Sequence, residues 1–322
     1  MKLKLLALSS RMCPTATYSR SVKLSSQSSS CSLARTYASL GQAAATAMEL
    51  GLNRSRFLGI GLEYADFREY QESDDVKYVD WTLSARSLDT ATGEYKLYTK
   101  VFHVEKMKNI IFVADLTDSM LIEEKLAALF YISSLLLELS HRLSDRISLV
   151  TLTHGPRVYR ALRGREAIRV LENIICRERE ARGSTRINEI IDILRAYTGK
   201  NTAITIITDY AHEIEEFAAL TRLKRAMMIP AAVYLIFQRW EIEQPVDNAT
   251  ATLIDPETLT PITDRLEEIY KAIKAHVSHV QALLSAARIN HLPVQGISDA
   301  KARTVKIAET YLKTRQMHVA SI

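Results

Sequence analysis

The chain has 322 residues, of which 47% are hydrophobic and 25% are charged, a composition typical of globular proteins with one large or two modest domains. Its formal net charge of +5 is concentrated at the start, because residues 1–60 hold eight basic residues and one acid and leave −2 for the remainder. This distribution argues against a nucleic-acid groove across the main domain. A basic arm that contacts phosphates, or a peripheral contact with an anionic membrane surface, stays open.

The cysteines and the apolar runs indicate the cellular compartment in which the protein is expected. Cys13, Cys31 and Cys176 are odd in number and have no paired spacing, so neither a disulfide framework nor a zinc site is expected. The longest apolar stretch, residues 126–137, is too short to cross a bilayer, and no transmembrane span is predicted. The opening residues lack a convincing secretion signal. We therefore expect a cytoplasmic protein.

The first hundred residues divide into two predicted regions. Residues 1–50 form a basic, Ser-rich arm, partly disordered or helical, whose composition also resembles an organellar transit segment. A helix is expected over residues 34–50, ended by Gly51. Residues 51–105 are predicted to be β-rich, because the turn-forming residues 89–93 separate two short runs and indicate a hairpin.

From about residue 106 the pattern changes to an alternation of strands and helices, which predicts a mostly parallel sheet covered by helices. We assign residues 106–290 to this α/β domain and 291–322 to a C-terminal helical tail. The predicted strands are 109–114, 147–153, 158–160, 203–208 and 231–237, with an edge strand and turn in 252–259. The predicted helices are 121–143, 165–180, 187–197, 213–227, 264–287 and 299–315.

Oxygen-bearing side chains follow two of these strands. Asp115, Thr117 and Ser119 alternate directly after a buried apolar run, where parallel sheets usually bind ligands. Thr185, just before a predicted helix, and Asp209, just after a predicted strand, belong to the same edge of the sheet. Hydroxyls and carboxylates suit a hard cation such as Mg²⁺, or Mn²⁺. A cation with few direct carboxylate ligands would attract a carboxylate from a protein partner.

Two alternatives remain open for these residues. In one, Thr117 and Ser119 cap the following helix, Thr185 caps its own helix, and Asp209 closes a turn. In the other, Asp115 is the nucleophile of a haloacid-dehalogenase-like, magnesium-dependent phosphotransferase. That reaction normally needs an acid at the position of Thr117. Because the chain has no complete catalytic constellation, we expect no enzyme activity. His212 lies three residues after Asp209 and is not predicted to be a ligand.

The Asp115, Thr117 and Ser119 spacing resembles the metal-ion-dependent adhesion site, or MIDAS, of von Willebrand factor type A domains, with its Asp-x-Ser-x-Ser pattern. A Thr stands in the first Ser place. The resemblance implies that Thr185 is the downstream Thr of that site, with Ser184 as an adjacent alternative, and that Asp209 is its later Asp. It also implies a Rossmann-like fold with helices on both faces of the sheet.

A second resemblance extends from about residue 53 to 288. Gly59–Tyr70, Asp74–Asp75, Val79–Trp81 and Ser84–Arg86, together with the tip at Asp115, are similar to the domain of unknown function 58 family. This family is built around a type A fold. The resemblance implies a partner, an AAA+ ATPase of the MoxR type, and a role in protein complex assembly or maturation. The chain itself lacks the phosphate-binding loop of such an ATPase.

The signature of that family is rich in charge and carries its own prediction. We interpret its acids and arginines as internal ion pairs that fix an inserted sheet, by carboxylate to guanidinium pairing, rather than as catalytic groups. Tyr70 and Trp81 are expected to be packing residues. The signature residues are Glu63, Arg68, Tyr70, Asp74, Asp75, Asp80, Trp81 and Arg86.

Overall fold

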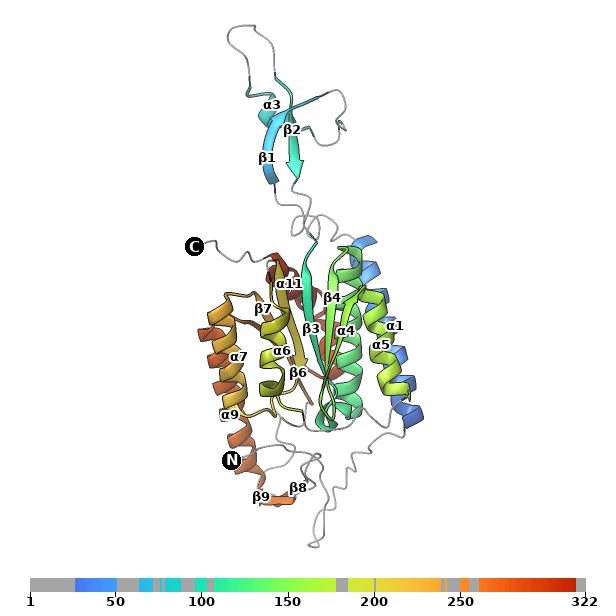
Figure 1. Cartoon of the computed structure of the whole chain (residues 1–322), viewed down its shortest axis with the longest axis vertical. Helices are drawn as coiled ribbons and strands as arrows, with labels where there is room; N and C mark the ends of the chain where they lie inside the picture. Colours follow the sequence, from blue (N-terminus) through green and yellow to red (C-terminus); the bar gives the residue numbers. More distant parts are fainter. Residues whose placement is uncertain are drawn as a thin grey trace. The chain divides into compact units, whose positions relative to one another are not determined.

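The computed structural model divides the chain into two compact units (Figure 1). Residues 48–106 form one unit, and the residues before and after them form the other. We describe each unit by itself. The residues that the structure describes are 27–50, 64–71, 76, 79–87, 96–102, 107–177, 185–199, 201–238, 241, 250–254 and 261–316.

The larger unit is an α/β domain built on a six-stranded sheet with the order β10–β7–β6–β3–β4–β5. All neighbouring strands are parallel except β5, which is antiparallel to β4. The five strands predicted before residue 238 are all present in this sheet. The strands are β3 (Asn109–Asp115), β4 (Arg146–Leu152), β5 (Pro156–Leu162), β6 (Thr202–Thr208), β7 (Ala231–Phe237) and β10 (Asn290–Gln295).

Strand β3 lies between β4 and β6, and it is buried on both faces because helices cover both sides of the sheet. Its apolar run is the sequence pattern of such a strand. The register pairs Ala114 with Ile207, so the next residue, Asp115, reaches the carboxyl edge of the sheet beside the end of β6. The same edge therefore holds the ends of three adjacent strands.

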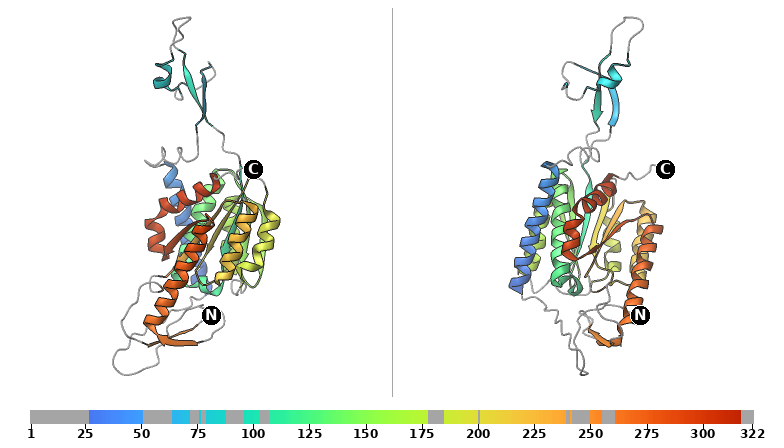
Figure 2. Two further views of the ribbon diagram at one scale, coloured as in Figure 1. Left: turned by 90° about the vertical axis from the view of Figure 1, so that its left-hand side faces the viewer. Right: turned by 180° about the vertical axis from the view of Figure 1, so that it is seen from behind.

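Helices cover both faces of the sheet, and Figure 2 shows the two layers. On one face α6, α7 and α9 bury a continuous apolar core with β3, β4, β6 and β7. On the other face α4 packs against β6 and β7, with α5, α10 and α11 against it. The helices are α1 (Gln27–Leu50), α4 (Glu123–Arg142), α5 (Gly164–Arg177), α6 (Ile187–Tyr197), α7 (Ile214–Met227), α9 (Leu266–Ala286), α10 (Gly296–Ala302) and α11 (Thr304–Gln316).

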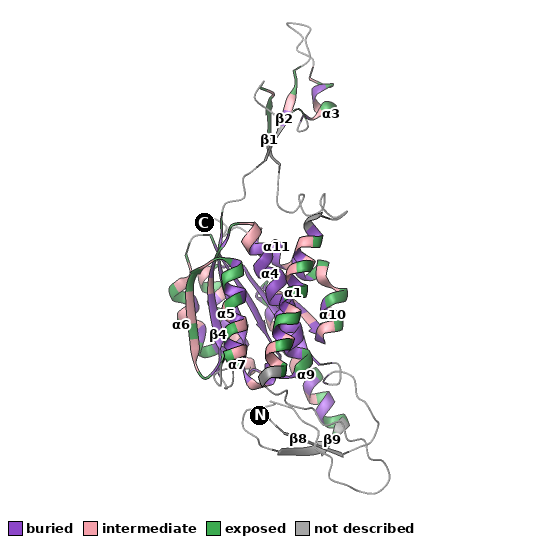
Figure 3. Ribbon diagram, turned by 90° about the vertical axis from the view of Figure 1, so that its right-hand side faces the viewer, coloured by how far each residue is buried: buried purple, intermediate pink, exposed green. Residues whose placement is uncertain are grey.

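Helix α4 is the most deeply buried helix of this unit, and most of its residues are drawn as buried in Figure 3. Helices α1 and α5 approach it so closely that a Cβ atom at Gly41 or Gly164 would collide with its backbone carbonyls. Only glycine permits these two contacts. No helix in the described part of the chain is long and apolar enough to span a membrane.

A disulfide joins Cys31 of α1 to Cys176 of α5, so the expectation of no disulfide is wrong. The two residues are 145 positions apart in the chain, yet their Cα atoms lie 4.6 Å apart, because both helices lie beside α4. Such a pair has no signature in cysteine spacing. Since disulfides persist mainly in oxidising compartments, the cysteines no longer support a cytoplasmic location.

The C-terminal part departs from prediction in two places. Strand β10 was not predicted, because its sequence Asn-His-Leu-Pro-Val-Gln has no apolar run, and its proline is tolerated at the edge of the sheet. The single helix expected over 299–315 is broken into α10 and α11 at Arg303. The predicted strand in 252–259 corresponds to β8 (Thr250–Ile254), which pairs with β9 (Pro261–Arg265); its turn lies outside the described residues.

The smaller unit contains an antiparallel pair, β1 (Tyr64–Glu69) and β2 (Tyr98–Phe102), and a short helix α3 (Trp81–Ser84). The Asp80 side chain caps α3 by accepting the backbone N–H groups of residues 82 and 83 at 3.0 and 2.9 Å. Trp81 is 61% exposed, contrary to the expectation that it packs inside.

Several predictions for this unit lie outside the described residues: Glu63, Asp74, Asp75 and the turn over 89–93. Among the other signature residues, Arg68 donates to the carbonyl of Glu69 at 3.2 Å. Tyr70 is half-buried and Arg86 is exposed. The predicted ion pairing of the signature stays a prediction.

Candidate metal centre

Asp115 is fully buried at the end of β3, and donors engage both of its carboxylate oxygens. Oδ1 accepts the backbone N–H of Thr117 at 2.9 Å and its hydroxyl at 2.7 Å. Oδ2 accepts the Thr208 hydroxyl at 2.6 Å and lies 3.0 Å from Nε2 of His212. A carboxylate has about four acceptor positions, and contacts at both oxygens orient Asp115 rigidly.

Thr117 and Ser119 are buried beside Asp115, and neither caps a helix. Thr117 precedes the short 3₁₀ helix Asp118–Leu121 without a capping hydrogen bond from its side chain, and the residue before α4 is Ile122. The alternative that these hydroxyls merely cap a helix is therefore wrong. The two hydroxyl oxygens lie 3.3 Å apart, and both retain lone pairs that a cation can use.

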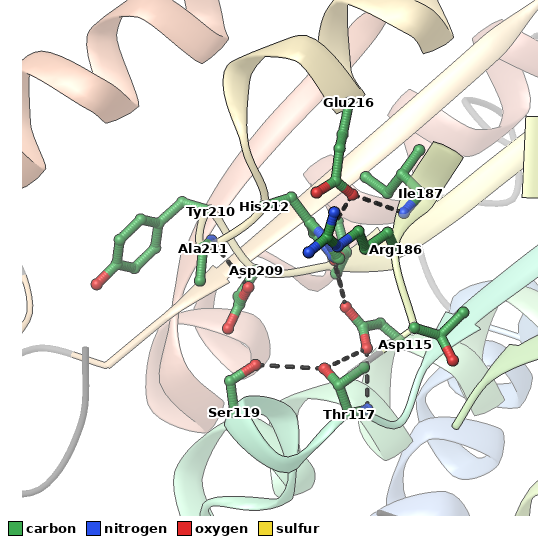
Figure 4. A network of polar contacts seen from close by, with 12 residues as sticks. Asp115, Thr117, Ser119, Arg186, Ile187, Asp209, Tyr210, Ala211, His212 and Glu216 are labelled. Atoms are coloured by element: carbon green, nitrogen blue, oxygen red, sulfur yellow. Dashed lines mark hydrogen bonds and ion pairs between the residues drawn. The ribbon is translucent and has the colours of Figure 1, made fainter. Parts of the chain in front are cut away.

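Asp209 follows β6 and faces the same edge. Its Oδ1 accepts the backbone N–H of Ala211 at 2.9 Å, which is the turn that the capping alternative predicted. Its Oδ2 lies 3.0 Å from the ammonium of Lys125, whose nitrogen is also 2.8 Å from Oε1 of Glu241. Figure 4 shows Asp209 on the same side of the strand ends as Asp115, Thr117 and Ser119.

The neighbouring charges shift the pKa values of Asp209 and Lys125. Burial acts to raise the pKa of Asp209, but the charges of Lys125 and His212 outweigh it and lower that pKa to about 2. Burial acts to lower the pKa of Lys125, and the charges of Asp209 and Glu241 raise it instead. Burial raises the pKa of Glu241 against the attraction of Lys125. Asp209 and Lys125 are therefore an ion pair.

His212 connects the centre to the start of α6. Its Nε2 lies 3.0 Å from Asp115 and 2.8 Å from the Thr208 hydroxyl, and its Nδ1 lies 3.3 Å from Oε2 of Glu216. That oxygen also accepts the backbone N–H of Ile187 at 2.7 Å. Burial acts to lower the pKa of His212, but hydrogen bonds to Asp115 and Glu216 raise it to about 10. These contacts fix the orientation of the imidazole beside Asp115.

Thr185 is buried and donates its hydroxyl to the backbone carbonyl of Thr153, at the end of β4. The residue at the N-cap position of α6 is Arg186, so the alternative that Thr185 caps that helix is wrong. A hydroxyl that donates to a carbonyl keeps its lone pairs, which leaves Thr185 available as a ligand. Ser184, the other residue considered for this place, lies outside the described residues.

The centre can hold a metal ion. Ligand atoms of Asp115, Asp209 and His212 lie within 4.8 Å of one another. Within the described part of the chain, four buried carboxylates surround the site, and they contact the buried ammonium of Lys125 and the buried imidazole of His212. An excess of buried negative charge is unfavourable without a counter-ion, so the donor set fits a cation. The carboxylates are Asp115, Asp209, Glu216 and Glu241.

Several residues of the centre were missed from the sequence. His212 was considered from the sequence, because it follows Asp209 by three residues, and was not expected to be a ligand. The structure instead places one of its ring nitrogens among the candidate ligand atoms. Lys125 had a weaker signal, as a charged residue at the start of a long apolar helix. Thr208 and Glu216 look like an ordinary strand end and a helix face, and Glu241 has no local pattern. The contacts of His212 with Thr208 and Glu216 are local, four positions apart. The contacts that bring Lys125 to Asp209 and Glu241, and His212 to Asp115, are long-range.

Comparison with known proteins finds one matching family model, described as protein of unknown function DUF58, over residues 66–278. One solved structure that the chain resembles is the conserved hypothetical protein BatB from Bacteroides thetaiotaomicron, with 16% identity, 65% of this chain and 100% of that chain covered, and a TM-score of 0.40. Another is an aerotolerance-related membrane protein from Bacteroides fragilis NCTC 9343 that carries multiple mutations to serines. It is 16% identical, the match covers 64% of this chain and 99% of that chain, and the TM-score is 0.40. A comparison with curated proteins finds no match.

Proposed function

The chain belongs to the DUF58 family, whose model matches more than half of its length, and we propose that it is a binding module that captures a protein partner through a divalent cation. The observation that carries the proposal is the excess of buried carboxylates over cationic side chains at the carboxyl edge of the sheet. The cation is Mg²⁺ or Mn²⁺, since oxygen atoms dominate the donor set.

The residues of this edge divide into direct and indirect roles. Thr117, Ser119 and Asp209 keep acceptor positions free and would hold the cation directly. Thr185, whose hydroxyl donates to the Thr153 carbonyl, would be a further ligand. Asp115 is contacted by protein groups at both oxygens, so its main role would be to supply charge and to orient the Thr117 hydroxyl. When bound, the cation would supply an electrophilic position for a carboxylate of the partner.

We further propose that the larger unit is a von Willebrand factor type A domain and that its cation site is of the MIDAS type. Three features support it: helices cover both faces of a mostly parallel sheet, the Asp115, Thr117 and Ser119 pattern follows the strand β3, and Asp209 follows the adjacent strand β6. The proposed partner is an AAA+ ATPase of the MoxR type, as the resemblance implies. Nucleotide hydrolysis would belong to that partner, and the chain itself would not be an enzyme.

The cation site is tested by calorimetric titration of the purified protein with MgCl₂ and with MnCl₂. We expect saturable binding to the wild type and none to Asp115→Ala, with circular dichroism confirming that the variant is folded. Asp192→Ala is the matched control, because Asp192 is 90% exposed on α6, and it should bind like the wild type. Equal heats for Asp115→Ala and the wild type would remove the site.

Partner capture requires a separate experiment. The immobilised protein is incubated with a purified MoxR-type ATPase in the presence of Mg²⁺ or of EDTA, and we expect retention in Mg²⁺ alone. A phosphatase assay on the same sample covers the alternative, the phosphotransferase that uses Asp115. Turnover that is lost in Asp115→Asn would favour the enzyme and contradict the binding module.

A further inference from the structure

Lys125 is an unusual residue for its place in the fold. It is 0% exposed in the first turn of α4, among residues that are mostly apolar. Its ammonium lies 3.0 Å from Asp209 and 2.8 Å from Glu241, both of which are also buried. Burial of a lysine and a glutamate together brings little stability compared with apolar residues of the same size. A function for this pair is therefore worth seeking.

We infer that Lys125 and Glu241 form a charge-setting pair that determines which ionic charge the cation site prefers. This inference rests on the proposed function. Lys125 contacts a proposed ligand, Asp209, directly, and Glu241 contacts Lys125 from the opposite side. The positive charge of the ammonium makes the electrostatic potential at a cation beside Asp209 less negative. The Glu241 carboxylate partly offsets this effect.

The surroundings of the pair make its charge effective. The ammonium lies 5.5 Å from the ring centroid of Tyr210, and that ring stacks on Phe237 with 5.1 Å between centroids. Both rings are buried, so little water screens the pair. At low effective dielectric, a change of one unit of charge close to a bound ion alters its affinity strongly. The alteration is larger for a trivalent ion than for a divalent ion of the same size.

Glu241 is itself held in place, which keeps the pair ordered. Its Oε2 accepts the backbone N–H of Gln238 at 2.7 Å, directly after the end of β7. Lys125 is fixed by the helix α4, whose neighbouring residues are buried against the sheet. The two charges therefore come from separate elements, α4 and the segment after β7.

The test compares affinities for Tb³⁺ and Ca²⁺, two ions of similar radius, in four proteins: the wild type, Lys125→Met, Glu241→Gln and the double variant. We expect the ratio of Tb³⁺ to Ca²⁺ affinity to rise by at least about tenfold in Lys125→Met. In Glu241→Gln it should fall by a similar factor. In the double variant, where one charge of each sign is lost, it should return close to the wild-type ratio.

A purely structural role would lower both affinities together and leave the ratio unchanged in every variant, which would overturn the inference. If Lys125→Met fails to fold because Glu241 is left unpaired, Glu241→Gln and the double variant still test the direction and the compensation. Lys271→Met, at an exposed position of α9, is the matched control and should keep the wild-type ratio. If the wild type binds Mg²⁺ or Mn²⁺ but neither Tb³⁺ nor Ca²⁺, the site selects by ion size and the inference is overturned. If it binds none of the four ions, the proposed function itself is wrong.

Discussion

The two ends of the same sheet both bury charge, but they balance it differently. At the amino edge, Asp145 meets one guanidinium, that of Arg315 in α11, with N to O distances of 2.8 and 2.9 Å, and it also accepts the backbone N–H of Lys108 at 2.9 Å. At the carboxyl edge, the buried carboxylates around Asp115 outnumber the cationic side chains in the described residues.

This difference separates a structural ion pair from a candidate site. The amino-edge pair is bidentate, with both Asp145 oxygens bound to the Arg315 guanidinium, so it anchors the last helix to the start of β4. Within the described residues, the carboxyl edge retains negative charge and hydroxyl lone pairs after its contacts are made. Burial of charge alone therefore does not mark a candidate binding site, whereas an excess of buried carboxylates does.

The largest expected change in stability follows from removing the ion pair between Asp145 and Arg315 at the amino edge. Asp145→Ala leaves the Arg315 guanidinium buried without its carboxylate, which should lower the free energy of unfolding by about 3–5 kcal/mol. Urea denaturation followed by circular dichroism measures this loss. Cation binding by the folded fraction should remain at the wild-type level, because the pair lies at the other end of the strands.

A double variant is the control for this first prediction. Asp145→Leu with Arg315→Met replaces both charges by apolar groups, and its stability should be close to that of the wild type. If the double variant loses as much stability as Asp145→Ala, the cost comes from packing and not from the unpaired charge. The comparison between the two edges would then fail.

The second prediction concerns stabilisation by the cation at the carboxyl edge. A divalent cation at about 100 times its dissociation constant should raise the free energy of unfolding by about 2.7 kcal/mol. The increase should occur in the wild type and in any Asp145 variant that folds, and be absent in Asp115→Ala. Thermal unfolding with MgCl₂ or MnCl₂ and with EDTA measures it. An equal increase in Asp115→Ala would place the cation elsewhere.

The third prediction separates the two hydroxyls that follow β3. Thr117→Val and Ser119→Ala should each weaken cation binding by at least about tenfold. Thr117→Val also removes the hydroxyl that donates to the buried Asp115 carboxylate and should cost about 1 kcal/mol of stability, whereas Ser119→Ala should have the smaller effect on stability. Thr117→Ser keeps the hydroxyl and should bind like the wild type. A large loss of stability with unchanged affinity would instead identify these residues as structural.

Local sequence patterns predicted those strands and helices whose formation depends mainly on residues close together in the chain. The apolar run before Asp115 predicted a buried central strand, and the alternation of strands and helices predicted the α/β sheet. The strand β10 escaped prediction because an edge strand with a proline and polar residues has no periodic signal. Its place is decided by pairing with β7.

The candidate site was predictable only in its oxygen ligands. Asp115 and Asp209 each end a predicted strand, so the sheet topology brings them to one edge. The charges that surround them come from α4, α7 and the segment after β7, and no spacing in the sequence links these elements. The disulfide between Cys31 and Cys176 escaped for the same reason, since two helices meet only after both have packed on α4.

The smallest expected effect concerns Thr185, and it decides how far the site extends. Thr185→Val removes the hydroxyl that donates to the Thr153 carbonyl, which should cost about 1 kcal/mol of stability. If Thr185 is also a ligand, cation affinity should fall as well, and Thr185→Ser should recover both properties. Calorimetry and urea denaturation on the same samples separate the two roles. A stability loss with wild-type affinity would restrict the site to β3 and the end of β6, and assign Thr185 to the fold.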